Sequence, residues 1–156
     1  MKPWAAIAAA ERVGGRILEV GVGTGISLPD YSNKNRIFGV DISPTMLRTA
    51  QDRVKELGLK HVEGLAVMDA ADLQFEDNSF DVVVAQYVVT TVPDPEGTLD
   101  EFARVLKPGG EIILDRARAV LRADFPARAE KIRLCAGLFQ PSGGTRHGRR
   151  TETHRA

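Results

Sequence analysis

Short apolar runs alternate with amphipathic stretches along the first 115 residues of this 156-residue chain. The runs predict strands, whereas the stretches between them place apolar residues three or four positions apart and predict helices. The stretch after the second run is the clearest helix, because Ser43 can cap it, Pro44 takes its first position and Gly58 follows its end. The predicted strands are residues 16–20, 36–41, 61–68, 80–89 and 111–115. The predicted helices are residues 5–12, 44–57 and 96–106, and KPGG at 107–110 ends the last of them. A further short helix is predicted after the glycines at 21–25, and Pro29 ends it.

Strands that alternate with helices predict an α/β fold, in which a mostly parallel sheet carries helices on both faces. The run FDVVVAQYVV at 80–89 is the most apolar segment, as expected for a strand that is covered on both sides. A chain of this length can bury a real core within one domain. We therefore predict one α/β domain over residues 1–115.

Residues 116–156 break the pattern. They hold ten basic residues, nine of them arginine, against three acidic ones, so this segment carries about +7 and residues 1–115 carry about −7. We predict a basic, Arg-rich tail that is partly disordered. Such a tail can touch anionic lipid headgroups or simply be solvated, and no nucleic acid is expected because interleaved aromatic residues for base stacking are missing. A further hypothesis is a GC-rich gene translated out of frame, which the other reading frames of the DNA would test.

The remaining composition predicts a cytoplasmic protein. The single cysteine, Cys135, forbids an internal disulfide and suits a reducing compartment. No apolar run approaches the roughly 18 residues of a membrane span, and no signal peptide is visible. His147 and His154 have no metal-like spacing with Cys135, so no metal site is predicted.

The stretch LEVGVGTGIS at 18–27 places Gly21, Gly23 and Gly25 directly after the first predicted strand. In open α/β sheets ligands bind at this end of the strands, and we expect backbone N–H groups and the start of a following helix to approach the ligand there. The spacing is not the G-x-G-x-x-G of dinucleotide sites, because Ile26 takes the last position. Asp41 ends the second strand, where a carboxylate can accept from both hydroxyls of a ribose. The alternative is a turn needed only for tight packing.

Five motifs together resemble class I S-adenosylmethionine-dependent methyltransferases. They are EVGVGTG at 19–25, GVDIS at 39–43, MDAADL at 68–73, NSFDVVV at 78–84 and EFARVLKPGG at 101–110. The resemblance covers about residues 12–115 and implies a Rossmann-like fold with S-adenosylmethionine as the cofactor. Since the family sheet usually has seven strands and five are counted here, we expect this chain to lack the last ones. If the tail is translated out of frame, the fifth strand is left as an exposed edge.

The resemblance also implies the roles of single residues in binding the cofactor. The glycine loop and the acid before it would hold the methionine end, the acid at the end of the second strand would take the ribose, and the adenine would lie between apolar and polar contacts. The residues are Glu19, Gly21, Gly23 and Gly25 for the methionine end, Asp41 for the ribose, and Ile42, Met46, Asp69 and Ala70 for the adenine.

Within the class, the sequence most resembles bacterial soluble-type phosphatidylethanolamine N-methyltransferases, and quinone C-methyltransferases are the next most similar. The implied methyl acceptor is a phospholipid or another small molecule, with peripheral contact at the inner membrane face. Tyr87 would orient the amine or hold a methylammonium by cation–π attraction, and its alternative is an ordinary aromatic at a strand end. A non-catalytic cofactor-binding fragment remains an alternative for the whole chain.

Three further polar residues are expected to serve structure. We expect Tyr31 to pack, with the role given to Tyr87 as its alternative. We expect Asp81 to cap a neighbouring backbone at the start of its strand, with a contact to the edge of the cofactor as its alternative. His61 is expected on the surface before the third strand.

Overall fold

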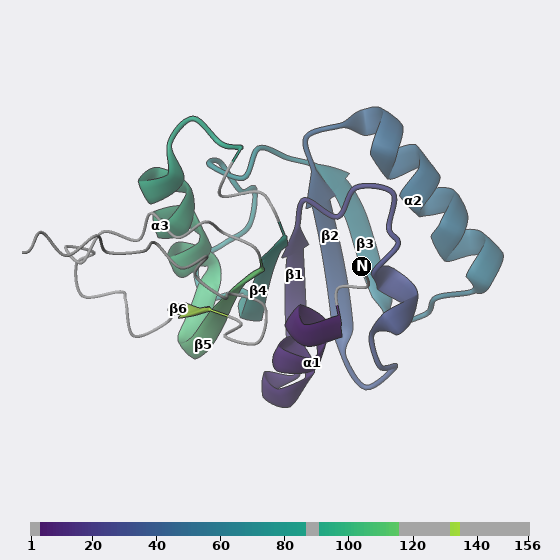
Figure 1. The fold of residues 1–156 in the computed structure, drawn as a ribbon, viewed down its shortest axis with the longest axis horizontal. Helices are drawn as coiled ribbons and strands as arrows, with labels where there is room; N and C mark the ends of the chain where they lie inside the picture. The colour runs from purple at the N-terminus through teal and green to yellow at the C-terminus, as the bar shows by residue number, and fades with distance from the viewer. Residues whose placement is uncertain (1–3, 87–90, 116–131, 135–156) are drawn as a thin grey trace, which may run out of the picture.

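The computed structural model describes residues 4–86, 91–115 and 132–134 and shows a parallel sheet with helices on both faces (Figure 1). Within these residues the strand order is β3-β2-β1-β4-β5-β6, and each neighbouring pair is parallel. The predicted α/β fold class is thereby confirmed. The strands are β1 Arg16–Val20, β2 Arg36–Asp41, β3 Val62–Val67, β4 Phe80–Gln86, β5 Leu106–Asp115 and β6 Ile132–Leu134, and the helices are α1 Trp4–Val13, α2 Pro44–Leu57, α3 Pro95–Val105 and the 3-10 helix η1 Leu28–Asp30.

Helices α2 and α3 each begin directly after a residue whose side chain caps the helix. The Ser43 hydroxyl accepts from the Met46 amide at 3.3 Å, and Gly58 ends α2 in the left-handed conformation at φ 59°. The Asp94 carboxylate accepts from the Gly97 amide at 3.0 Å and starts α3 in the same way. Each bond satisfies an amide that the helix itself leaves unpaired.

Three local predictions are wrong. Pro29 lies inside η1 instead of ending a helix, so only a three-residue 3-10 helix follows the glycine loop. The KPGG segment lies within β5, which begins at Leu106 directly after α3 and accommodates the glycines through a register shift against β4. The fifth strand is not an exposed edge, because Ile132 to Leu134 pair with Ile112 to Leu114. The rest of the predicted tail, 116–131 and 135–156, lies outside the described residues.

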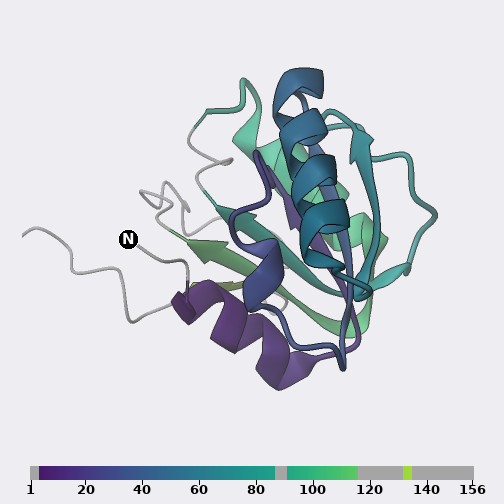
Figure 2. The same ribbon diagram turned by 90° about the vertical axis from the view of Figure 1, so that its right-hand side faces the viewer.

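The core has two layers, one on each face of the sheet. On one face α1, η1 and the first turns of α2 cover β1, β2 and β4. On the other face α3 and the loop after β3 cover β1, β4 and β5. Figures 1 and 2 show α1 and α3 on opposite sides of the sheet. Phe75 joins the loop to the sheet by edge-to-face contacts with Phe38 and Phe80, with centroids 5.0 and 4.9 Å apart.

The parallel arrangement brings the carboxyl ends of β1, β2, β3 and β4 to one edge of the sheet. From β1 the chain runs outward through β2 and β3, then returns to pair β4 on the other side of β1. The strand order therefore reverses beside β1, which is where a crevice for a ligand opens in this kind of sheet.

Candidate functional site

A cavity of about 330 Å³ opens at this reversal point. Its volume lies at the lower end of the range for small-molecule sites. The lining comes from the ends of β1, β2 and β3 and from the segment after β4. The lining residues are Val20, Gly21, Asp41, Ile42, Met68, Asp69, Ala70, Thr91, Val92 and Pro93.

Asp41 is the most firmly held polar group of this lining. One carboxylate oxygen accepts from the Gly23 amide and the other from the Ser43 amide, each at 2.9 Å. These bonds tie the glycine loop to the cap of α2 through a single side chain. Because a carboxylate oxygen has two lone-pair sites, each oxygen keeps capacity for one more donor. Asp41 therefore has the capacity to accept from two further donors, such as two hydroxyl groups.

The amides of the three glycines donate within the chain, so the expected approach of loop N–H groups to a ligand does not rest on these three. Gly21 donates to the Val40 carbonyl at 2.9 Å, Gly25 donates to the Val22 carbonyl at 3.0 Å, and Gly23 donates to Asp41. No α-helix starts at the loop, because η1 has three residues and begins at Leu28. The three glycines therefore shape the site through the path of the backbone.

That path requires glycine. The three glycines have φ of 77°, 58° and 76°, where L-residues with a side chain are strained. Gly25 has a second reason, since a Cβ there would lie 2.9 Å from Leu28 Cδ1 and 3.1 Å from Ala50 Cβ. The alternative reading of the loop as a tight packing turn thus holds for Gly25, whereas Gly21 lines the cavity.

Glu19 lies behind the loop, not among the described residues that line the cavity. Its side chain is 2% exposed, and the Ser27 hydroxyl donates to the carboxyl, 2.7 and 2.8 Å from its two oxygens. Burial raises the pKa of the Glu19 carboxyl from its ordinary 4.5 to about 7, and the Ser27 hydrogen bond opposes part of that rise. A buried carboxyl with this raised pKa thus lies behind the glycine loop.

The loop after β3 forms the other wall of the cavity. Ala70 is buried against the core, and the exposed Asp69 accepts from the Ala71 amide at 2.9 Å. Arg104 of α3 fixes the loop by donating to the Leu73 carbonyl at 2.9 Å and the Phe75 carbonyl at 2.8 Å. The adenine segment expected from the sequence is therefore a braced loop beside Asp41.

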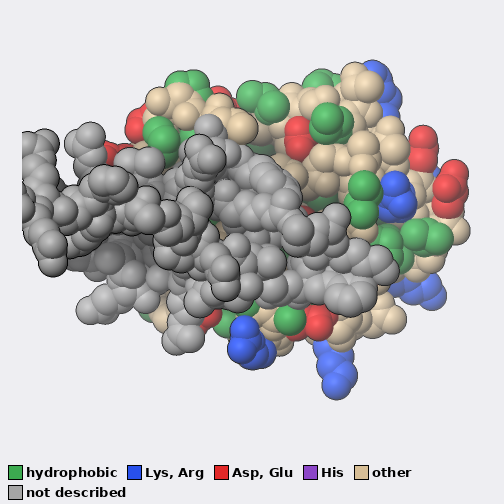
Figure 3. Space-filling view, viewed as in Figure 1, with side chains coloured by type: hydrophobic (Ala, Val, Ile, Leu, Met, Phe, Trp, Pro, Cys, Tyr) green, Lys and Arg blue, Asp and Glu red, His purple; other side chains and the backbone are tan. Residues whose placement is uncertain are grey.

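Two apolar residues at the start of α2 are open to solvent. Ile42 lines the cavity and is 71% exposed, and Met46 is 48% exposed with its sulfur 3.8 Å from the place of a Cβ on Gly23. Ile26 beside the loop is 66% exposed. Figure 3 shows hydrophobic side chains along the edge of the molecule toward which the strand arrows of Figure 1 point. Such exposure suits residues that are covered only when a ligand is bound.

Sequence reasoning missed Met68 and the segment 91–93 in the lining. Met68 follows the carboxyl end of β3, and the segment 91–93 follows that of β4. This position in the sequence was the one signal that could have identified them as lining residues. Tyr87, the candidate catalytic residue, lies outside the described residues, as do Cys135, His147 and His154.

Of the predictions for Asp81 and His61, the first is confirmed and the second is wrong. Asp81 is confirmed as a cap, since its carboxylate accepts from the Arg16 amide at 2.9 Å and lies 3.4 Å from the Lys107 ammonium, away from the cavity. His61 was expected on the surface, and this is wrong. It is 6% exposed, with Nε2 2.7 Å from the Leu28 carbonyl and Nδ1 3.0 Å from Asn33 Oδ1. His61 therefore connects the start of β3 to η1.

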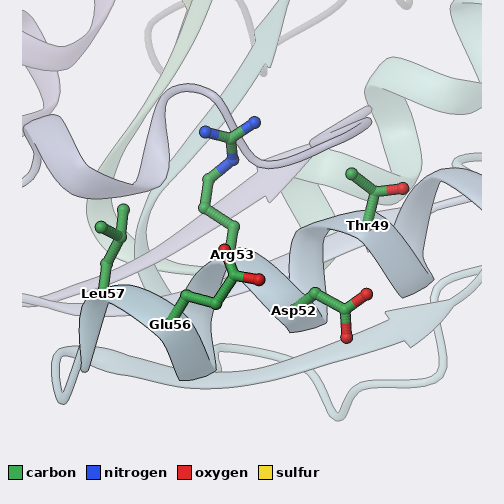
Figure 4. Close-up of a pocket in the computed structure, with 5 residues that line it drawn as sticks. All are labelled: Thr49, Asp52, Arg53, Glu56 and Leu57. Atoms are coloured by element: carbon green, nitrogen blue, oxygen red, sulfur yellow. The ribbon is translucent and has the colours of Figure 1, made fainter.

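A second hollow, of about 300 Å³, lies along the outer side of α2 (Figure 4). Its lining mixes charges of both signs, and it shares no residue with the first cavity. Arg53 turns toward the glycine loop and donates to the Thr24 carbonyl at 3.1 Å. The lining residues are Thr49, Asp52, Arg53, Glu56 and Leu57.

Two further findings bear on function. Among the described residues, no group of three or more His, Cys, Asp or Glu side chains is placed to hold a metal ion. None of the described helices combines the length and apolar character needed to span a membrane.

The chain is similar to known methyltransferases. It is 50% identical over 101 residues to a phosphatidylethanolamine N-methyltransferase of Cereibacter sphaeroides, covering 65% of this chain and 50% of that protein. It is 39% identical over 104 residues to a demethylmenaquinone methyltransferase of Bacillus cytotoxicus, covering 64% and 44%. The crystal structure of a SAM-dependent methyltransferase from Aquifex aeolicus superposes with a TM-score of 0.59 at 26% identity, covering 64% and 56%.

The chain spans about half the length of the curated relatives it matches. A family model described as a methyltransferase domain matches residues 18–114, which run from β1 to the end of β5 and include every residue of the cavity lining. The chain therefore belongs to the methyltransferase domain family, which implies S-adenosylmethionine as its cofactor.

Proposed function

We propose that residues 1–115 form the S-adenosylmethionine-binding domain of an enzyme that N-methylates phosphatidylethanolamine. The observation that carries the proposal is the cavity at the carboxyl ends of the strands, with Asp41 in its lining and held by two backbone donors. The 50% identity to a phosphatidylethanolamine N-methyltransferase favours the phospholipid amine. The 39% identity to a demethylmenaquinone methyltransferase favours methylation of a quinone precursor as the second candidate.

The residues of the cavity fit an adenosine group. Asp41 accepts the two ribose hydroxyls with the lone pairs that its backbone donors leave available. Ala70 and the exposed side chain of Ile42 offer apolar surfaces to a flat ring, with Met46 at the rim, and Asp69 lies within the same lining to accept from an exocyclic amine.

In this proposal the glycine loop and Glu19 bind the methionine end of the cofactor. Gly21 and Gly23 present backbone without side chains, so a ligand can approach the loop closely. Glu19, once ionised, attracts the ammonium of the amino acid from behind the loop. Gly25 keeps the loop against α2.

When bound, S-adenosylmethionine supplies a methyl group already activated by its sulfonium. The chain has to hold an acceptor in line with that group and to exclude water. The ammonium of phosphatidylethanolamine must first lose its proton, since a protonated amine has no lone pair. We assign to Tyr87, directly after β4, the orientation of the amine and cation–π attraction to its methylated forms.

The acceptor implies contact with a membrane surface. Phosphatidylethanolamine resides in bilayers, so the enzyme would act peripherally at the cytoplasmic face of a membrane. Ile42 of the cavity lining and Ile26 and Met46 beside the glycine loop are exposed and apolar, which suits this contact.

The test is transfer of a labelled methyl group from S-adenosylmethionine to vesicles of phosphatidylethanolamine, run beside demethylmenaquinone in the same vesicles. We expect label in the phospholipid fraction, and loss of label with Asp41→Ala. Label in the quinone alone would favour the second candidate. Cofactor binding with no transfer to either acceptor would make the chain a non-catalytic cofactor-binding fragment and contradict the proposal.

A further inference from the structure

The ion pair of Glu101 and Arg104 joins α3 to the loop after β3. Arg104 Nε and Nη2 donate to the two carboxylate oxygens of Glu101, at 2.9 and 2.7 Å. Arg104 also donates to the carbonyls of Leu73 and Phe75, at 2.9 and 2.8 Å, and to the carboxylate of Asp77 at 2.9 Å. These bonds use every N–H group of the guanidinium, so the side chain is fixed in one orientation.

The pair holds both backbone polar groups of Leu73. The amide of Leu73 donates to Glu101 Oε1 at 3.0 Å, and the carbonyl of Leu73 accepts from Arg104. Because Leu73 is 3% exposed, these two groups would be left unpaired and away from water if the ion pair were removed, which is costly. The loop therefore keeps its present path only while α3 supplies these partners.

A tight turn connects Leu73 to Asp69 in the wall of the cavity. The Asp72 amide donates to the Asp69 carbonyl at 3.0 Å, and the Ala71 amide donates to Asp69 Oδ1 at 2.9 Å. The buried Ala70 belongs to the same core cluster as Leu73 and the inner side of α3. Since the turn is bonded within itself, a shift at Leu73 moves Asp69 with it.

We propose that Glu101 and Arg104 are positioning residues that set the preference of the cavity for adenine over hypoxanthine. This inference rests on the proposed function, in which Asp69 accepts from the exocyclic amine of the adenine. Asp69 uses Oδ1 for the Ala71 amide, and a carboxylate has a second oxygen that can accept from this amine.

The preference follows from the chemistry of the two bases. Hypoxanthine carries a carbonyl oxygen in place of the amine, so a carboxylate held at this position meets an acceptor instead of a donor. A carboxylate that can move away from the base no longer distinguishes the two. Glu101 and Arg104 are not among the residues that line the cavity, so they act through the position of the loop.

The experiment is calorimetric titration of the full chain at pH 7.5 with S-adenosylhomocysteine and with S-inosylhomocysteine, which carries hypoxanthine in place of adenine. The readout is the ratio of the two affinities. A loss of folded protein affects both titrations alike and leaves this ratio unchanged, whereas a moved Asp69 changes it. The variants are Arg104→Ala, Glu101→Ala, Asp69→Ala and the double variant Asp69→Ala with Arg104→Ala.

Arg16→Ala is the matched control. Arg16 forms the same kind of fork with Glu63, at 3.0 and 3.1 Å, and its side chain is 33% exposed against 31% for Arg104. Arg16 is the first residue of β1, so it lies at the end of the sheet opposite to the cavity. Its loss removes a similar ion pair without touching the loop after β3.

We expect the wild-type chain and Arg16→Ala to bind S-adenosylhomocysteine about tenfold more tightly than S-inosylhomocysteine. Arg104→Ala, Glu101→Ala and Asp69→Ala should each bring the ratio close to one. The double variant should show the same ratio as Asp69→Ala alone, because both changes act on one contact.

A wild-type ratio in Arg104→Ala or Glu101→Ala overturns the inference, and so does equal binding of the two ligands by the wild-type chain. In both cases binding of S-adenosylhomocysteine still upholds the cofactor site of the proposed function. Binding of neither ligand to the folded wild-type chain overturns the inference and the proposed function together.

Discussion

Replacing Glu19 by glutamine should stabilise the protein at neutral and higher pH. The carboxyl has a pKa of about 7 when buried against its ordinary 4.5, so folding takes up a proton between these values. The folded state therefore binds more protons than the unfolded state in this window, and the free energy of unfolding falls as pH rises through it. Above about pH 7 the loss is complete. Glutamine does not titrate and avoids this loss.

The size of the effect follows from the width of the window. A difference of about 2.5 pH units, taken between 4.5 and about 7, corresponds at about 1.4 kcal/mol per unit to about 3 kcal/mol. Stability lost by the wild type between pH 4.5 and 8 should thus exceed that lost by Glu19→Gln by this amount. Other ionisable groups contribute equally to both proteins and cancel in the comparison.

Urea unfolding of the two proteins at pH 4.5, 5.5, 6.5, 7.5 and 8.5, followed by circular dichroism, measures this difference. We expect Glu19→Gln to gain stability over the wild type steadily from pH 4.5 to 7 and then to keep a constant advantage. Ser27→Ala should extend the wild-type loss to higher pH, because the hydroxyl lowers the pKa of Glu19. A stability difference that does not change with pH would refute the reasoning.

Two further predictions concern the scaffold of the site. Arg104→Ala should lower the free energy of unfolding, measured with urea, by about 2 kcal/mol. The reason is that two carbonyls and two carboxylates lose their donor, those of Leu73 and Phe75 and those of Glu101 and Asp77. An effect under about 0.5 kcal/mol would contradict this prediction. Gly25→Ala should cost more than the roughly 1–2 kcal/mol of a left-handed residue, because its Cβ also meets Leu28 and Ala50. Gly58→Ala, with φ 59° and open space around its Cβ, is the control, and equal melting temperatures for the two glycine variants would count against the packing argument.

The regular elements of the fold could be predicted because local patterns determine them. The apolar runs at 16–20, 36–41 and 80–89 predicted β1, β2 and β4, and the cap formed by Ser43, Pro44 and Gly58 predicted the bounds of α2 to the residue. The position of Asp41 beside the glycine loop also followed from sequence, since the ends of adjacent parallel strands must meet.

The errors arose where tertiary contacts override local signals. KPGG is a typical helix end, yet Leu106 before it and Glu111 after it both pair with β4, so the segment lies within the strand as an irregularity of the register. His61 is polar but buried, because two polar groups from distant segments satisfy its ring. The acceptors of the glycine amides, which are Val40, Val22 and Asp41, are equally set by the three-dimensional path of the loop.

The burial of Glu19 was equally hidden from the sequence. An acid in a strand of five residues can face solvent or the interior, and alternation alone does not decide when both faces of the sheet are covered. The η1 segment and α1 cover it here, and its pKa follows from that cover.

The central claim is that Asp41 holds the ribose of S-adenosylmethionine in the cavity beside the glycine loop. Calorimetric titration with S-adenosylhomocysteine at pH 7.5 of the wild-type chain, Asp41→Ala and Asp52→Ala tests it most directly, because Asp52 is an acid of the neighbouring α2 that lines only the second hollow. The account predicts binding by the wild type and Asp52→Ala, and about 100-fold weaker binding by Asp41→Ala, as expected from the loss of two charge-assisted hydrogen bonds. Equal affinity of all three folded proteins, or no binding by the wild type, would contradict it.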